Sequence, residues 1–263
     1  MLTLDESPAT ADDLQPLALT NFGHFTSMRV SEDGSVRGLS LHLERLARDS
    51  KSVFGVTVDT ERVRDNVRRA VGEAGCPCTI RVTVYDPAVD MGHPVDAKTP
   101  RALVSVRPAG DIPAAPLSAM SVMYERDLPE VKHVGLFGPL HARRAAQQAG
   151  FDDALFVGRD GHVSEGVTWN VAFIDGDGTV VWPQAPVLPG ITMALLQQHG
   201  AGIEHRTAPV ILDQAKDMAA AFATNTSVGV RPLSRLDDKE LPTKHPVLDA
   251  LTASYLSIPG EVL

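Results

Sequence analysis

The chain has 263 residues, of which 43% are hydrophobic, 22% are charged and 5% are aromatic. This length allows one large domain or two modest ones, and the composition excludes disordered, collagen-like, coiled-coil and disulfide-rich chains. The formal net charge is −9. Nucleic acids and membrane surfaces attract positively charged proteins, so we expect neither as a partner.

No run of about 18 apolar residues occurs, and the N-terminal segment MLTLDESPATADD is acidic where a targeting segment would be basic. The sequence therefore predicts a cytoplasmic protein. Cys76 and Cys78 form a Cys-Pro-Cys pair with no second pair and no nearby histidine. Such a pair fits neither a zinc site nor a secreted disulfide framework, so we expect reduced thiols at the start of a strand and no metal site.

Hydrophobic periods of two and of 3.6 residues alternate along the first half of the chain, which predicts a mixture of strands and helices. Two helices have recognisable ends, because Ser40 and Asp59 are typical N-caps and Gly55 and Gly75 are typical stops. The predicted elements, in chain order, are strands at 17–22 and 25–30, a turn at Asp33-Gly34, the helix from Ser40 to Gly55, the helix from Asp59 to Gly75, and strands at about 79–85 and 102–107.

The segment PAGDIPAAPL has no periodicity and is rich in proline and glycine, which predicts a linker over 109–117 between domains at 1–108 and 118–263. In the second domain, short turns at 159–161 and 175–178 predict antiparallel strand pairs. The predicted elements there are a strand at 118–124, a helix at 139–149, three strands separated by those turns, a helix at about 190–199, strands near 203–207, 220–224 and 228–233, and a helix at about 246–257.

Two ionisable residues are candidates for chemistry. Lys132 lies in ERDLPEVKHVG, between a predicted strand and a predicted helix, and an exposed surface lysine is the alternative. Glu165 lies in GHVSEGVTWNV, where a buried carboxylate would need a cation such as a protonated pyridine nitrogen. An exposed strand position is the alternative for Glu165.

Two further features are suited to binding phosphate. In VLPGIT, Pro189 and Gly190 force a turn, so that free backbone N–H groups and the Thr192 hydroxyl open the next helix. An ordinary helix start is the alternative there. In LHLERL, Arg45 has core-facing neighbours and offers a planar guanidinium, although a surface arginine paired with an acid would also fit.

These pieces, in this order and spacing, resemble the class IV pyridoxal-phosphate-dependent enzymes, the family of branched-chain and D-amino-acid aminotransferases and of aminodeoxychorismate lyase. The resemblance begins at 21–30, continues through 42–46 and ends at 225–233, and its most specific part is E-G-x-x-x-N combined with L-P-G-I-T. It implies an α+β fold with a small α/β N-terminal domain and a C-terminal domain with a barrel-like antiparallel sheet and helices. It also implies pyridoxal 5'-phosphate between the domains, and a homodimer.

The resemblance makes Lys132 the Schiff-base lysine, Glu165 the partner of the pyridine nitrogen and Arg45 a phosphate ligand. The remaining expected phosphate ligands are Ile191, Thr192 and Thr226. These roles agree with the chemistry of the residues, because the cofactor needs an amine nucleophile, a carboxylate at its ring nitrogen and an anion site. Lys132, once displaced by the incoming amine, is placed to carry the α-proton.

The sequence departs from the family pattern at His24, where many members carry an acid, and at Gly135 and Phe137, where aminotransferases often have asparagine and tyrosine. The Lys132-His133 pair and the segment 225–230 are more similar to the lyases. Substrate identity is therefore open.

The arginine–histidine pair that holds the substrate carboxylate in D-amino-acid aminotransferases has no full counterpart within 79–107. Arg81 is the one candidate there, and a structural arginine on an edge strand is its alternative. Ser227 is a second candidate for substrate contact. The resulting expectation is an aminotransferase for a small amino acid and keto acid pair. The alternatives are an elimination of the aminodeoxychorismate type that releases pyruvate, and a catalytically silent protein that binds the cofactor or a phosphorylated metabolite.

Overall fold

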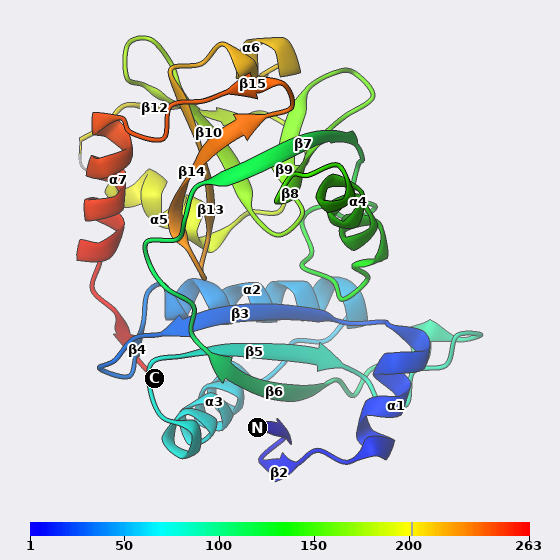
Figure 1. Ribbon diagram of the computed structural model, residues 1–263. Helices are drawn as coiled ribbons and strands as arrows, with labels where there is room; N and C mark the ends of the chain where they lie inside the picture. Colours follow the sequence, from blue (N-terminus) through cyan, green and yellow to red (C-terminus); the bar gives the residue numbers. More distant parts are fainter. Residues whose placement is uncertain (201) are drawn as a thin grey trace. The chain divides into compact units, whose positions relative to one another are not determined.

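The computed structural model describes residues 1–200 and 202–263 (Figure 1). Contacts divide the chain into unit 1, formed by Met1–Ala109, Val131–Gly135 and Pro259–Leu263, and unit 2, formed by Gly110–Glu130 and Leu136–Ile258. Unit 1 thus includes two segments that follow residue 130. A division at a single linker over 109–117 would place both segments in the C-terminal domain. Among the described residues, none of the helices combines the length and the apolar character that crossing a bilayer requires.

Unit 1 is built on one sheet with the strand order β16-β4-β3-β5-β6-β1-β2, in which every neighbouring pair is antiparallel (Figure 1). Its strands are β1 (Leu2–Leu4), β2 (Ser7–Pro8), β3 (His24–Val30), β4 (Ser35–Val36), β5 (Cys78–Tyr85), β6 (Arg101–Pro108) and β16 (Glu261–Val262). Its helices are α1 (Ala11–Thr20), α2 (Leu39–Phe54), α3 (Thr60–Ala74) and the single 3-10 turn η1 (Pro94–Asp96).

One face of this sheet is apolar and packs against α2 and α3. Met28, Ile80 and Val82 point to this face because side chains alternate along a strand, and Leu46 and Val67 meet them from the helices. The predicted ends of α3 are confirmed, since the Asp59 carboxylate accepts from the amide of Arg62 at 3.0 Å and Gly75 follows the last turn. The core of unit 1 therefore follows from the periodicity of the sequence.

The predicted strand at 17–22 is wrong, because most of this segment belongs to α1. Thr10 and Asp13 form a reciprocal cap that starts this helix upstream of the apolar residues. Leu14 and Leu17, three residues apart, then pack together against Tyr85 and its neighbours on the opposite face of the sheet. The expected cap of α2 is also wrong: Gly38 takes that position, and Ser40 donates to the Glu261 carboxylate instead.

Unit 2 is built on a barrel-like sheet. Its strands are β7 (Leu117–Met123), β8 (Asp153–Val157), β9 (Val163–Gly166), β10 (Asn170–Ile174), β11 (Val180–Pro183), β12 (His205–Ala208), β13 (Ala220–Asn225), β14 (Gly229–Leu236) and β15 (Lys239–Glu240). Its helices are α4 (Phe137–Gln148), α5 (Ile191–His199), α6 (Leu212–Lys216) and α7 (Pro246–Ser257). A pairing of β10 with β9 closes the ring β9-β10-β13-β14-β7-β8.

The interior of this barrel is filled by alternate strand residues, among them Leu155, Val171, Phe173 and Leu233. The short turns join antiparallel pairs as expected, β8 with β9 and β10 with β11. In contrast, β7 pairs in parallel with β8 and with β14, because helices or long segments rather than tight turns connect them. The sheet is therefore mixed, with both parallel and antiparallel pairs.

Candidate active site

Lys132 belongs to a short extended segment that lies along β3 in unit 1. The Lys132 carbonyl accepts from the Phe25 amide at 2.8 Å, and the next residue forms a β-bridge with His24. The Lys132 amide donates to Asp49 Oδ2 on α2 at 3.0 Å. Lys132 is half-buried, with its Nζ 4.9 Å from the centroid of the Phe25 ring. The alternative of a fully exposed lysine is thus wrong.

Arg81 lies near the same aromatic ring as Lys132. Its guanidinium carbon is 3.7 Å from the centroid of the Phe25 ring, and its Nε donates to the Thr83 hydroxyl at 3.2 Å. The alternative of an edge-strand arginine is wrong, because β5 lies between β3 and β6. Burial lowers the pKa of Arg81, and the positive charge of Arg107 lowers it further. Unit 1 therefore gathers a lysine and an arginine around Phe25.

Arg45 is a buried cation on α2, with only 5% of its surface exposed. Within the described part of the chain it makes no ion pair, and its Nε has no hydrogen-bond partner. Burial lowers the pKa of Arg45 to about 10, while the nearby Asp49 carboxylate acts in the opposite direction. The side chain remains charged at neutral pH. The alternative of a surface arginine paired with an acid is wrong, because Arg45 is buried and makes no ion pair among the described residues. A buried cation of this kind is stabilised by a bound anion.

The Arg45 guanidinium is held by a chain of hydrogen bonds. Its Nη2 donates to the Thr26 hydroxyl, which lies 2.7 Å from His42 Nδ1. Arg45 Nη2 also lies 3.3 Å from His42 Nδ1, and because an arginine can only donate, this contact suits an unprotonated Nδ1. Burial, Arg45 and Lys132 together hold the pKa of His42 well below its usual range. His42 is therefore neutral.

His24, the first residue of β3, is fully buried, and neither of its ring nitrogens has a partner among the described residues. Its ring centroid lies 6.0 Å from that of Phe54. Burial lowers its pKa from 6.5 to about 3, and the positive charges of Arg45 and Arg48 contribute. The folded chain therefore keeps His24 neutral at pH values where the unfolded chain binds a proton there.

We expect the free energy of unfolding to fall on acidification through His24. Above pH 6.5, the contribution of the neutral His24 to the free energy of unfolding is fully present. It is lost progressively as the pH falls toward 3, because the unfolded chain binds a proton that the folded chain does not. Between pH 7 and pH 5 the loss is up to about 2 kcal/mol larger for the wild type than for His24→Phe. Urea unfolding at pH 7, 6 and 5 measures it. The exposed His93, changed to phenylalanine, is the control, and equal pH slopes in wild type and His24→Phe would contradict the expectation.

In unit 2, Glu165 is 2% exposed, and its Oε1 accepts from Arg126 Nε at 2.6 Å. Arg126 also donates through Nη2 to the Val167 carbonyl at 2.8 Å, which fixes the plane of the guanidinium. Glu165 is not an exposed strand residue, so that alternative is wrong. The ion pair allows the carboxylate to stay charged inside the protein.

The E-G-x-x-x-N motif is a tight β9–β10 connection whose ends face each other. Asn170 pairs in register with Glu165, and its Nδ2 donates to the Leu188 carbonyl at 2.8 Å. This hydrogen bond attaches the L-P-G-I-T loop to the strand next to the carboxylate. Asn225 Nδ2 donates to the Thr168 carbonyl at 3.2 Å and attaches the β13–β14 turn to the same connection. Three segments distant in sequence are thereby brought together in unit 2.

Glycine is required at two points of this arrangement. A Cβ on Gly166 would overlap the indole ring of Trp169, and a Cβ on Gly190 would overlap Asn170 Oδ1. Both glycines thus let the chain approach a side chain more closely than any other residue could. The glycines of the E-G-x-x-x-N and L-P-G-I-T motifs are therefore required by packing.

The L-P-G-I-T loop leads into α5 without a side-chain cap at its N-terminus. Ile191 and Thr192 are buried in its first turn, and the Thr192 hydroxyl has no partner among the described residues. Thr226 and Ser227 lie half-buried in the β13–β14 turn, where the Ser227 amide donates to Asn225 Oδ1 at 2.9 Å. Backbone N–H groups and a hydroxyl without partners at a helix N-terminus suit a phosphate.

Sequence reasoning missed several residues that shape these sites. They are Arg126, Thr26, His42, Asp49 and Asn225 as a tether. For Arg126 a signal existed, since it lies in ERDLPEVKHVG, the same segment as Lys132. Thr26, His42 and Asn225 lie in the segments that carry the family resemblance, but no role was assigned to them there. Asp49 has no such signal, because its role depends on a residue far away in the sequence.

Comparison with known families matches residues 23–236 to the model of the amino-transferase class IV family. The chain belongs to this family. Class IV aminotransferases are pyridoxal-phosphate-dependent enzymes, so the resemblance, the enzyme class and the cofactor expected from the sequence are confirmed. Within the family, a Rickettsia bellii protein named as a probable branched-chain-amino-acid aminotransferase is 28% identical over 120 residues. That match covers 43% of this chain and 41% of the relative.

Solved structures of an aminotransferase and of a protein assigned as a lyase share the fold. A hypothetical aminotransferase from Mycobacterium tuberculosis, in its cofactor-bound form, has a TM-score of 0.82 at 22% identity and 98% coverage of both chains. A Legionella pneumophila protein assigned as a 4-amino-4-deoxychorismate lyase has a TM-score of 0.81 at 22% identity and 93% coverage of both chains. At this identity the likeness confirms the α+β fold class alone.

Each unit of this class IV chain contains buried donors of the type that binds the phosphate of the cofactor. In unit 1, Arg45 leaves Nε without a partner, and no carboxylate of the described residues lies within ion-pair distance of it. In unit 2, the hydroxyls of Thr192 and Thr224 are buried and without partners among the described residues. Buried donors without acceptors are rare in proteins unless a ligand or water meets them.

We expect Thr26→Val to weaken binding of pyridoxal phosphate about tenfold, because Arg45 loses the hydroxyl that orients it. Equilibrium titration of the cofactor-free protein, followed by absorbance, measures the dissociation constant without reference to activity. Thr79→Val, at another buried threonine of the same sheet, is the matched control. A wild-type dissociation constant for Thr26→Val would show that Arg45 does not depend on this hydrogen bond.

Proposed function

We propose that the protein is an aminotransferase that moves an amino group between a small amino acid and a keto acid, with Lys132 as its catalytic amine. The observation that carries the proposal is Arg45, a buried arginine that makes no ion pair among the described residues, in the same unit as the half-buried Lys132. Family membership and the branched-chain aminotransferase name of the Rickettsia relative support it.

When bound, pyridoxal phosphate supplies an aldehyde that condenses with amines and a ring that accepts the electron pair left behind by the α-proton. The proposed task of Lys132 is to hold the cofactor and then, as a free amine, to take the α-proton and return it. Its backbone is fixed on both sides, by Phe25 through the carbonyl and by Asp49 through the amide. This anchoring keeps the backbone of Lys132 in a constant position while its side chain carries the amine.

Glu165 is proposed to accept a hydrogen bond from the protonated ring nitrogen of the cofactor. Arg126 binds Oε1 and orients the carboxylate, and the pairing with Asn170 across the strands places it next to the L-P-G-I-T loop. A carboxylate held in this way needs no reorganisation during the reaction, which is the condition for electrostatic catalysis.

The phosphate is proposed to be held by Arg45, by the first turn of α5 at Ile191 and Thr192, and by Thr226. The substrate carboxylate is proposed to meet Arg81, with Ser227 as a further contact. Support for Arg81 comes from its position against Phe25, the ring that Lys132 also contacts. The working form is proposed to be a homodimer, with an amino donor and a keto acid acceptor as its small-molecule partners.

Elimination is a second candidate. The pair Lys132-His133 and the segment 225–230 favour it, because both are more similar to the lyases of the family. In a lyase, a β-substituent would leave after Lys132 has taken the α-proton, and pyruvate would be released. The Legionella protein assigned as an aminodeoxychorismate lyase shares the fold.

The half-reaction separates these functions. We expect the holoenzyme, incubated with an amino acid and no acceptor, to yield one keto acid and one pyridoxamine phosphate per site. Repeated release of pyruvate without an acceptor, with the cofactor remaining in its aldehyde form, would instead establish the lyase. Absence of any spectral change with a panel of amines, despite bound cofactor, would establish a catalytically silent protein.

A further inference from the structure

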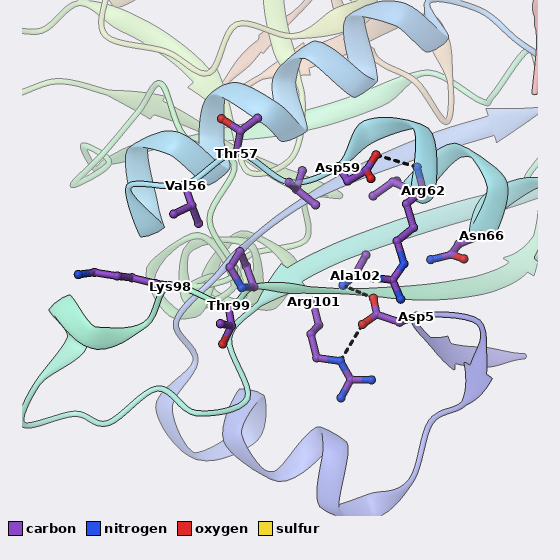
Figure 2. A pocket seen from close by; sticks show the side chains of 13 residues that line it. Asp5, Val56, Thr57, Asp59, Arg62, Asn66, Lys98, Thr99, Arg101 and Ala102 are labelled. Carbon is purple, nitrogen blue, oxygen red and sulfur yellow. Dashed lines mark hydrogen bonds and ion pairs between the residues drawn. The ribbon is translucent and has the colours of Figure 1, made fainter.

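Unit 1 contains a pocket that none of the proposed catalytic or cofactor-binding residues lines. Its volume is about 310 Å³, near the lower limit of about 300 Å³ for small-molecule sites. It is formed by 56–59, the first turns of α3, residues 98–102 and Asp5 (Figure 2). Its size suits a ligand with few heavy atoms.

Asn66 is a buried polar side chain that lines this pocket. This side chain is 2% exposed, and both its Oδ1 and its Nδ2 have no hydrogen-bond partner among the described residues. A buried amide without partners is costly, so it normally meets a ligand or an ordered water. Figure 2 shows the amide pointing from α3 toward the guanidinium of Arg62.

Arg62 and Asn66 are four residues apart on α3, so their side chains lie on one face of the helix. Both lie at the pocket, and both can donate hydrogen bonds. The ion pair of Arg62 with Glu6 is 4.0 Å long and exposed, so it holds the guanidinium weakly. Two donors on one helix face are suited to a carboxylate.

Acidic groups line the same pocket. Asp59 accepts from the Arg62 amide through Oδ1 only, and among the described contacts its Oδ2 accepts nothing. Asp5 accepts from Arg101 Nε at 2.7 Å and from the Ala102 amide at 3.1 Å, which fixes its orientation. Lys98 and Arg101 line the pocket as well, so that groups of both signs surround it together with Asp5, Asp59 and Arg62. A ligand with a single charge is repelled by one of these two sets. A ligand that carries both charges satisfies both sets of groups.

We propose that this pocket binds the zwitterionic head of a free α-amino acid. Its carboxylate meets Arg62 and Asn66, and its ammonium group meets Asp59 and Asp5. Val56, Val58 and Val63 line the pocket as well and offer an apolar surface to the ligand side chain. The site is separate from Lys132, and the proposal does not depend on the reaction that Lys132 catalyses.

The Asn66 side-chain amide signals in the NMR spectrum of the ¹⁵N-labelled holoenzyme report on this pocket, and their loss in Asn66→Ala assigns them. We expect glycine and L-leucine to shift these signals saturably with one ligand per pocket. Acetate and methylammonium, which carry one charge each, are expected to bind at least tenfold more weakly. No shift with either amino acid would overturn the proposal, and so would an equal shift with acetate alone.

Two variants test the separate ends of the ligand. Arg62→Gln removes the carboxylate partner, and Asp59→Asn removes a charge while keeping a side chain that caps helices equally well. Each is expected to weaken amino acid binding at least tenfold. Arg68→Gln, on the same helix but outside the pocket, is the matched control and is expected to bind like the wild type. Unchanged affinity in both Arg62→Gln and Asp59→Asn would overturn the proposal.

Discussion

Lys132→Ala is expected to abolish turnover while the chain still folds. The substitution removes the amine that is proposed to hold the cofactor and carry the α-proton, so both steps lose their catalyst. The fold is retained because the backbone hydrogen bonds of Lys132 to Phe25 and Asp49 do not involve its side chain. Steady-state rates and the circular dichroism of wild type and variant measure the two effects.

Lys51→Ala, at an exposed lysine on α2, is the matched control and is expected to keep wild-type rates. Borohydride reduction of the holoenzyme, followed by peptide mapping, identifies the labelled lysine directly. The assignment fails if the label lies on any of the other lysines, which are Lys51, Lys98, Lys216, Lys239 and Lys244.

Glu165→Gln is expected to slow α-proton removal about 10²-fold or more while the cofactor stays bound. Glutamine keeps a side-chain oxygen that can accept from Arg126 Nε, so the packing around this position is preserved. The substitution removes the negative charge that is proposed to keep the ring nitrogen protonated. Single-turnover kinetics with an α-deuterated amino acid measure the step.

Glu240→Gln, at an exposed strand position, serves as the control for a change of net charge. Cofactor content, measured after gel filtration, distinguishes a slower chemical step from loss of the cofactor. A wild-type rate in Glu165→Gln with full cofactor content would remove Glu165 from the proposed mechanism.

Much of unit 1 could be predicted from the sequence because its signals are local. The ends of α3 follow from Asp59 and Gly75, and its buried face follows from the spacing of Val63, Val67 and Ala70. The failure at 17–22 is also physical, since the reciprocal cap at Thr10 starts a helix before the apolar residues begin. Local patterns predict elements well where the caps and the periodicity agree.

The candidate site was predictable in its residue types and only partly in its arrangement. Lys132, Glu165 and Arg45 were identified from motifs, since each needs a particular chemistry at a particular place in the chain order. Their partners were not, because Arg126 precedes Glu165 by 39 positions and Thr26 precedes Arg45 by 19. No period of 2 or 3.6 residues reports which strands and helices meet.

By itself, the sequence determined most of the classes of element, the family and the residues proposed for the chemistry. Only the tertiary structure decided that Lys132 joins β3 in unit 1, that Asn170 connects Glu165 to the L-P-G-I-T loop, and that Asn66 is buried at a pocket with no hydrogen-bond partner among the described residues. The physical reason is that burial and hydrogen-bond pairing depend on segments distant along the chain, whereas caps, turns and periodicity depend on neighbours.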